Sequence, residues 1–236
     1  MTEELFRDDA YARTCGATVT AVDDRGIQLD RTVFYATGGG QPGDAGALRL
    51  ADGRTIAIVE TRRDRESGDH LHVPAEGAPR PAVGTAVTAE IDWQRRHRLM
   101  RMHTAMHLLC SLIPQGVTGG AVGEDRSRLD FDLPDTVLDK EGLAAALNRL
   151  IEEDHVVGTR WISDAELAAQ PDLVRTMSVK PPIGAGRVRL VAIEGVDLQP
   201  CGGTHVARTG EVGRIAIGKI ENKGKHNRRI TLLLEE

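Results

Sequence analysis

Two pairs of metal-ligating side chains stand out in the sequence. His103 and His107 are separated by three residues, and Cys201 and His205 repeat that spacing in the segment CGGTH. On a helix, side chains at i and i+4 lie about 40° apart around the axis, so two imidazoles can share one metal ion. Three imidazoles and one thiolate suit zinc better than magnesium or calcium. Either pair alone is more often an ordinary buried pair, but together they predict a zinc site.

The chemistry of such a site depends on how many positions the protein fills. Thr104 follows His103, so the glutamate base of the HExxH metalloproteases is missing and that class is excluded. A zinc ion with an open position lowers the pKa of bound water to about 7 and polarises a carbonyl group. Four protein ligands are instead typical of a structural site. The sequence leaves these two alternatives open.

A glycine-rich segment, GGGQPGD, occupies residues 38–44. Its consecutive backbone N–H groups can receive a carbonyl or phosphate oxygen. The spacing matches neither the phosphate-binding loop nor the dinucleotide-binding pattern. A wide hairpin turn is therefore the competing interpretation of Gly38, Gly39, Gly40 and Gln41.

Basic residues gather in two places although the net charge is −5. Such clusters beside the metal motifs resemble a phosphate-backbone footprint, with a solvated charged face as the alternative. Aromatic residues make up only 3%, which argues against a surface built of stacking platforms for single-stranded bases. The candidate phosphate contacts are Arg95, Arg96, Arg98, Lys223, Lys225, Arg228 and Arg229.

The elements that position these residues change character near residue 91. The first part alternates short apolar runs with Gly and Asp turns, which predicts a small β-barrel or sandwich. The second part is predicted to be α+β, with helices on a largely antiparallel sheet. We therefore expect an N-terminal β-barrel domain over 1–90 and an α+β zinc-binding domain over 91–236. The strands expected in the first part are 17–22, 26–30, 32–36, 46–50, 54–60, 70–73 and 86–92.

The histidine helix is the clearest element of the second part. Apolar residues recur at 3-4-3-4 spacing between Asp92, a predicted N-cap, and Pro114, a predicted stop. A second helix is expected over 139–154, and Ser163 with Glu166 predicts a capping box. Residues 116–123 are expected to form a glycine-rich loop. The strands expected here are 127–133, 156–163, 187–194, 213–221 and 228–235.

The remaining composition narrows the class of protein. No run of the 236 residues approaches the roughly 18 apolar residues that a membrane helix needs. The acidic N-terminus does not resemble a signal peptide. Three scattered cysteines do not form a disulfide framework and favour a reducing cytoplasm.

Taken together, these motifs resemble a known family. The HxxxH helix in IDWQRRHRLMRMHTAMHLL, the downstream CGGTH, TVFYATGGGQPGD and IENKGKHNRRI are similar to the editing domain of alanyl-tRNA synthetase and its free-standing AlaX-type relatives. The resemblance covers nearly the whole chain. It implies a β-barrel followed by a zinc domain shared with threonyl-tRNA synthetase. It also implies hydrolysis of a wrong amino-acid ester, chiefly serine and in some members glycine, on alanine tRNA.

The resemblance assigns roles to positions of this sequence. His103, His107, Cys201 and His205 become the zinc ligands and the catalytic centre. Thr32 and the segment Gly38–Gln41 become the amino-acid pocket, and the basic residues become acceptor-stem contacts. Thr37 stands where relatives often carry Glu, so it receives no role. The chain lacks the aminoacylation and oligomerisation segments of a synthetase, so we expect a complete trans-acting editor, with its oligomeric state open.

Selectivity is the hardest requirement of such an activity. Alanine is smaller than serine, so a steric pocket cannot exclude it, and a buried polar partner must recognise the serine hydroxyl. Thr32 is our candidate, and Thr32→Val is expected to leave folding nearly unchanged. Two other functions remain open: a zinc-stabilised tRNA-binding module, and a zinc hydrolase of small esters or amides.

Overall fold

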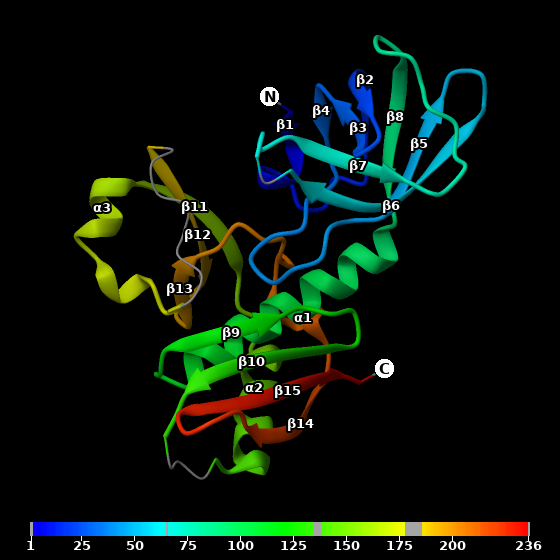
Figure 1. The fold of residues 1–236 in the computed structure, drawn as a ribbon. Helices are drawn as coiled ribbons and strands as arrows, with labels where there is room; N and C mark the ends of the chain where they lie inside the picture. Colours follow the sequence, from blue (N-terminus) through cyan, green and yellow to red (C-terminus); the bar gives the residue numbers. More distant parts are fainter. Residues whose placement is uncertain (1, 65, 135–137, 178–185, 236) are drawn as a thin grey trace. The chain divides into compact units, whose positions relative to one another are not determined.

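A computed structural model describes residues 2–64, 66–134, 138–177 and 186–235 (Figure 1). The chain divides into two compact units, Met1–His97 and Arg98–Glu236. The division falls inside helix α1 (Trp93–Leu112). The division of the chain into a domain over 1–90 and a zinc-binding domain over 91–236 stays a prediction.

Unit 1 is built on a closed six-stranded barrel, which confirms the predicted barrel. In the strand Thr55–Arg63, for example, Ile56 and Ile58 are buried in the interior and their neighbours are exposed. The strand predicted at 86–92 closes the barrel because it pairs with both Thr14–Asp23 and Gly46–Leu50. In barrel order the strands are β2 (Thr14–Asp23), β3 (Gly26–Leu29), β7 (His70–Pro74), β6 (Thr55–Arg63), β5 (Gly46–Leu50) and β8 (Ala86–Ile91).

The strand predicted over 32–36 is wrong beyond its first residue. Strand β4 (Arg31–Thr32) pairs with β1 (Glu3–Glu4), which precedes the short helix η1 (Leu5–Arg7). In the residues that follow β4, the backbone N–H groups donate to side-chain oxygens instead of to a neighbouring strand. Thr32 Oγ1 accepts from Phe34 N at 3.0 Å, and Asp44 Oδ2 accepts from Tyr35 N at 2.6 Å. These bonds satisfy a buried backbone without a sheet.

Helix α1 begins and ends where the sequence predicts. The Asp92 carboxylate accepts a hydrogen bond from Arg95 N at 3.1 Å, and the helix stops before Pro114. The predicted apolar face is buried, but Met100 and Leu108 on other sides are also fully buried. A helix enclosed on several sides holds its side chains in fixed positions.

Unit 2 has two antiparallel sheets where one was predicted. The first has the order β14 (Ile215–Asn222), β15 (Asn227–Leu234), β10 (Arg126–Asp132) and β9 (Val117–Ala121). The second has the order β11 (Val157–Ser163), β12 (Arg187–Ile193) and β13 (Asp197–Pro200). The remaining elements are α2 (Lys140–Glu152), α3 (Asp164–Ala168), η2 (Pro171–Leu173) and η3 (Thr209–Val212).

Strand β9 overturns the predicted glycine-rich loop at 116–123. Gly119 and Gly120 pair with β10, and a Cβ on Gly120 would approach Leu129 Cδ2 and Met106 Cε to 3.2 and 3.3 Å. These glycines therefore allow close packing against neighbouring side chains rather than a turn. The capping box at Ser163 is confirmed. Within the described residues, no helix combines the length and apolar character needed to cross a membrane.

Candidate metal centre

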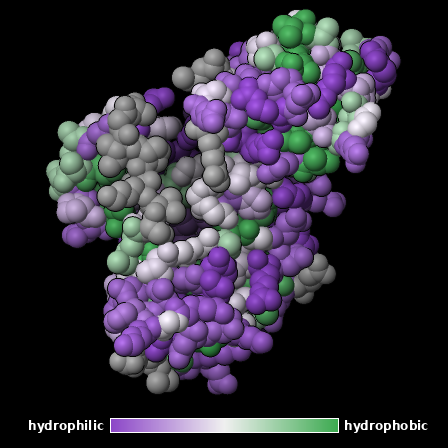
Figure 2. Space-filling model, in the orientation of Figure 1, coloured by the Kyte–Doolittle hydropathy of each residue, from purple (hydrophilic) through white to green (hydrophobic). Residues whose placement is uncertain are grey.

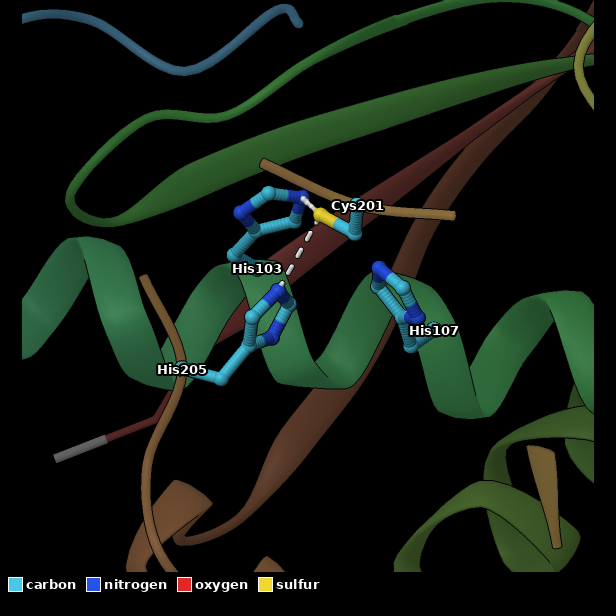
Figure 3. A group of neighbouring side chains, drawn as sticks. All are labelled: His103, His107, Cys201 and His205. Atoms are coloured by element: carbon cyan, nitrogen blue, oxygen red, sulfur yellow. Dashed lines mark hydrogen bonds between the residues drawn. The ribbon is translucent and has the colours of Figure 1, made fainter. Parts of the chain in front are cut away.

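Helix α1 and the loop after β13 bring the two predicted pairs together (Figure 3). One ligand atom from each of His103, His107, Cys201 and His205 lies within 4.8 Å of the others. Cys201 Sγ is 3.6 Å from His103 Nε2 and 3.3 Å from His205 Nε2. Ligands of tetrahedral zinc stand roughly 3.5 Å apart, given metal–ligand bonds of about 2.0–2.3 Å. The group is therefore compatible with zinc, as the sequence predicts.

Two side chains outside the group orient its imidazoles. Asp197 Oδ2 lies 3.0 Å from His107 Nδ1, and Thr104 Oγ1 lies 3.1 Å from His205 Nδ1. A carboxylate only accepts, so His107 Nδ1 carries a proton and leaves Nε2 for a metal. Sequence reasoning missed both partners. Thr104 is adjacent to His103, but nothing in the sequence connects Asp197 to a histidine ninety residues earlier.

The members of the group shift one another's pKa values. Burial opposes ionisation of Cys201, but the neighbouring imidazoles, His103 foremost, outweigh it and hold the pKa of the thiol well below its ordinary value. Burial would lower the pKa of His107, but hydrogen bonds with Asp197 and Cys201 raise it to about 9. Burial and the neighbouring His103 lower the pKa of His205 to about 3. The half-buried Cys201 thiolate and the buried Asp197 carboxylate both contact His107, and a divalent cation would compensate their negative charge.

The predicted amino-acid pocket belongs to unit 1, where Thr32 is fully buried. His72 Nδ1 lies 3.0 Å from the Ile27 carbonyl, which only accepts, so this nitrogen carries the proton of the neutral ring. Burial keeps that ring neutral by lowering the pKa of His72 to about 3. His72 Nε2 must then accept from Thr32 Oγ1, at 2.8 Å. The Thr32 proton is thus already used, and its oxygen also accepts from Phe34 N.

The glycine-rich segment forms the hairpin turn that the sequence left as an alternative. Gly38 and Gln41 exchange both backbone hydrogen bonds, at 3.1 and 2.9 Å. Gly39 and Gly40 between them have φ values of 56° and 84°, a left-handed conformation that favours glycine. The Gln41 side chain is buried. A role of Gly38–Gln41 in substrate binding stays a prediction.

Arg96 corrects the predicted phosphate footprint at the start of α1. Its side chain is fully buried, and its Nε lies 3.0 Å from both carboxylate oxygens of Asp44. It also donates to the carbonyl groups of Ala10 and Val33. This arginine holds unit 1 together and has no surface left for a phosphate. Arg95 donates to the Gly43 carbonyl, and Arg98 pairs with Asp125.

The second basic cluster lies on the hairpin of β14 and β15, beside a largely hydrophilic face of the four-stranded sheet (Figure 2). Arg229 forms two hydrogen bonds with Asp130, at 2.7 and 2.8 Å. Lys223 lies 3.7 Å from Glu221, whereas Lys225 is exposed and Arg228 is half-buried. Lys225 and Arg228 therefore remain the better candidates for phosphate contacts.

Known proteins resemble the chain over nearly its full length. Residues 188–231, which include Cys201 and His205, match the family model of the threonyl and alanyl tRNA synthetase second additional domain. Residues 9–95 match the family model of class II (A) tRNA synthetases. The alanyl-tRNA editing protein AlaX-M of Methanosarcina acetivorans is 39% identical over 99% of both chains. That of Saccharolobus solfataricus is 34% identical over 98% of both. The alanine–tRNA ligase of Pyrobaculum calidifontis is 36% identical over 93% of this chain and 25% of its own length.

Proposed function

Because the chain belongs to the family of alanyl-tRNA editing proteins of the AlaX-M type, we propose that it deacylates mischarged tRNA(Ala) in trans with a bound zinc ion. Its chief substrate is seryl-tRNA(Ala), and glycyl-tRNA(Ala) is a second candidate. The observation that supports this proposal most directly is the convergence of three imidazoles and one thiolate within 4.8 Å. The partner is the acceptor end of the tRNA that carries the wrong amino acid.

The chain's own residues supply positioning and electrostatics. His103, His107, Cys201 and His205 would hold the ion, which when bound supplies Lewis acidity toward a carbonyl or water. Asp197 and Thr104 fix the orientation of two of these imidazoles, and Gly203 N donates to Cys201 Sγ at 3.4 Å. An aminoacyl ester is already activated, so accurate placement of ester and water can provide much of the acceleration.

A second candidate function has one observation in its favour. Four protein ligands saturate a tetrahedral site, as in structural zinc centres. The chain would then be a zinc-stabilised tRNA-binding module without hydrolytic activity. A hydrolase of small esters that binds no nucleic acid is the third possibility.

Incubation with seryl-, glycyl- and alanyl-tRNA(Ala) separates these functions. We expect the protein to release serine rapidly and to spare the alanyl ester. A protein that binds tRNA without releasing any amino acid is the binding module. One that cleaves small serine esters without binding tRNA is the small-ester hydrolase.

The tRNA-binding surface is tested by Lys225→Ala combined with Arg228→Ala. Each lost phosphate contact should reduce the slope of log affinity against log salt by about 0.9. Hydrolysis of a small serine ester should be unchanged. Arg214→Ala is the matched control, since Arg214 is exposed in the same unit and pairs with Glu235. An equal loss on both substrates would show that Lys225 and Arg228 do not act through phosphates.

Thr32 remains our candidate for recognition of the serine hydroxyl, in a narrower role. Because its proton is directed to His72, its oxygen can only accept a further hydrogen bond. The serine hydroxyl would then be the donor. Thr32→Ser should keep the preference for seryl-tRNA over alanyl-tRNA, and Thr32→Val should lose part of it.

A further inference from the structure

One aromatic side chain of unit 2 differs from all the others in the protein. The two Trp, two Tyr and three Phe all lie in the described part of the chain. Trp161, in strand β11, is the only exposed one among them, with 38% of its surface accessible. An exposed indole provides a flat surface on which a planar partner can stack.

Positive charge accompanies this ring. The Arg187 guanidinium lies over Trp161, with its Cζ 4.4 Å from the ring centroid. Arg160 precedes Trp161 in the strand and therefore belongs to the opposite sheet face, so Arg187 is the cation beside the ring. Among the described residues, Arg187 forms no ion pair. An aromatic surface with an uncompensated arginine is a combination that binds single-stranded nucleic acid, because bases stack and phosphates are attracted.

The sheet relates this ring to the candidate metal centre of the same unit. Trp161 is directly opposite Arg189 in the pairing of β11 and β12. Cys201 N donates to the Arg189 carbonyl at 3.1 Å and continues the ladder after β13. Directly opposite residues share a sheet face, so Trp161, Arg189 and Cys201 form one row. Neighbouring strands stand about 4.8 Å apart, which places the Trp161 backbone about 10 Å from that of Cys201.

We propose that Trp161 and Arg187 form a stacking site for a base of the single-stranded end of the tRNA acceptor. This inference rests on the proposed function, since it takes the aminoacyl ester to lie at the metal centre. If the terminal ribose ester of the tRNA lies at the metal centre, the single strand that carries it must extend from there over the surface of the protein. The row ends at Trp161 in an aromatic surface beside the Arg187 guanidinium, whereas Arg189 between Trp161 and Cys201 is buried and donates to the Cys201 and Gly203 carbonyls. The stacked base would hold the ester in register with the metal ligands.

Kinetics provide the first test. Trp161→Ala should lower kcat/KM for seryl-tRNA(Ala) by roughly fivefold to a hundredfold, the usual contribution of one stacked base. Trp161→Phe should retain most of the activity because it keeps an aromatic face. Hydrolysis of a small serine ester, which has no base, should be unchanged in both variants. Val156→Ala, which truncates an exposed side chain just before β11, is the matched control.

Two kinetic results would overturn the inference. The first is wild-type kcat/KM on seryl-tRNA(Ala) in Trp161→Ala. The second is an equal loss on seryl-tRNA(Ala) and on the small ester, which would make the ring a structural element.

A binding measurement keeps this inference separate from the proposed function. Titration with the trinucleotide CCA should quench tryptophan fluorescence in the wild type and not in Trp161→Phe, which retains only Trp93. Quenching that depends on Trp161 supports the stacking site even if the wild type releases no serine, a result that would refute the hydrolase alone. Deacylation without such quenching refutes the stacking site alone.

Discussion

Each unit contains a cluster of buried histidines, and the two clusters differ in how their ring nitrogens are used. In unit 1, the His70 and His72 rings lie 5.2 Å apart, and His72 uses both nitrogens on Ile27 and Thr32. In unit 2, His103 and His205 lie 4.3 Å apart, and both direct Nε2 at Cys201. Burial and ring spacing are therefore similar in the two clusters.

The difference shows that proximity of imidazoles does not make a metal site. A metal centre needs one nitrogen of each ring fixed by the protein and the other directed at a shared point, together with a soft anion. In unit 2, Asp197 and Thr104 fix the rings of His107 and His205, and Cys201 supplies the soft anion. Unit 1 has a hydroxyl where the thiolate would be needed, and the geometry of its bonds fixes the tautomer of His72.

The largest expected effect is the loss of zinc, which should follow substitutions in the cluster of unit 2 but not in that of unit 1. The wild type should bind about one zinc per chain, and Cys201→Ala or His103→Ala should lose most of the zinc and the activity. Both variants should also unfold more easily, since metal binding free energy is also folding free energy. His72→Gln should keep its zinc. Metal analysis with thermal unfolding measures both quantities, and full activity in a strong chelator would disprove the zinc assignment.

The next effect concerns the partner of His107. Asp197→Ala removes the carboxylate that fixes the imidazole, and zinc affinity should fall by about 10- to 100-fold. Asp197→Asn should retain part of that affinity, because its amide oxygen accepts the same hydrogen bond. Competition with a chromogenic chelator measures the change. Equal zinc affinity in the wild type and Asp197→Ala would show that His107 needs no orienting partner.

The third effect concerns the closed cluster of unit 1. Thr32→Val leaves His72 Nε2 and Phe34 N buried without their partner, which should destabilise the protein by about 1–3 kcal/mol. This revises the expectation that folding would be nearly unchanged. Thr32→Ser keeps the hydroxyl and should be close to the wild type, and zinc content should not change in either variant. Urea unfolding midpoints provide the measurement, and equal midpoints for Thr32→Val and Thr32→Ser would contradict the network.

The smallest effect is a pH dependence at the edge of the same cluster. Burial opposes ionisation of Glu4, but hydrogen bonds with His70 and Arg7 outweigh it and lower the pKa of Glu4 from 4.5 to about 2. A depressed folded-state pKa gives stability that is complete above pH 4.5 and lost as the pH falls toward 2. Because Arg7 and Arg63 are partly exposed, we expect only about 1 kcal/mol.

Glu4→Gln tests this dependence. The variant should lack this part of the acid sensitivity between pH 5 and pH 2.5, which lie about half a pH unit above the unfolded-state and the folded-state pKa. Unfolding free energies at both pH values measure it. An identical pH dependence in Glu4→Gln and the wild type would contradict the assigned role of Glu4.

Much of the local structure was determined by the sequence alone. Helix α1 follows from its apolar spacing, the Asp92 cap and the stop at Pro114. Because i and i+4 always share a helix face, His103 and His107 had to point the same way. The capping box at Ser163 and most barrel strands also follow from patterns of a few neighbouring residues.

The partner of each buried polar side chain depends on the packing of the whole chain. Arg96 looks like its neighbours in the sequence, yet it is buried against Asp44, fifty-two positions away. Asp197 and His107 are ninety positions apart, and Thr32 and His72 are forty positions apart. Helices, caps and turns are stabilised by hydrogen bonds between residues close in sequence, so a short segment encodes them. The partner of a buried side chain is set by which elements pack together, and that depends on the whole chain.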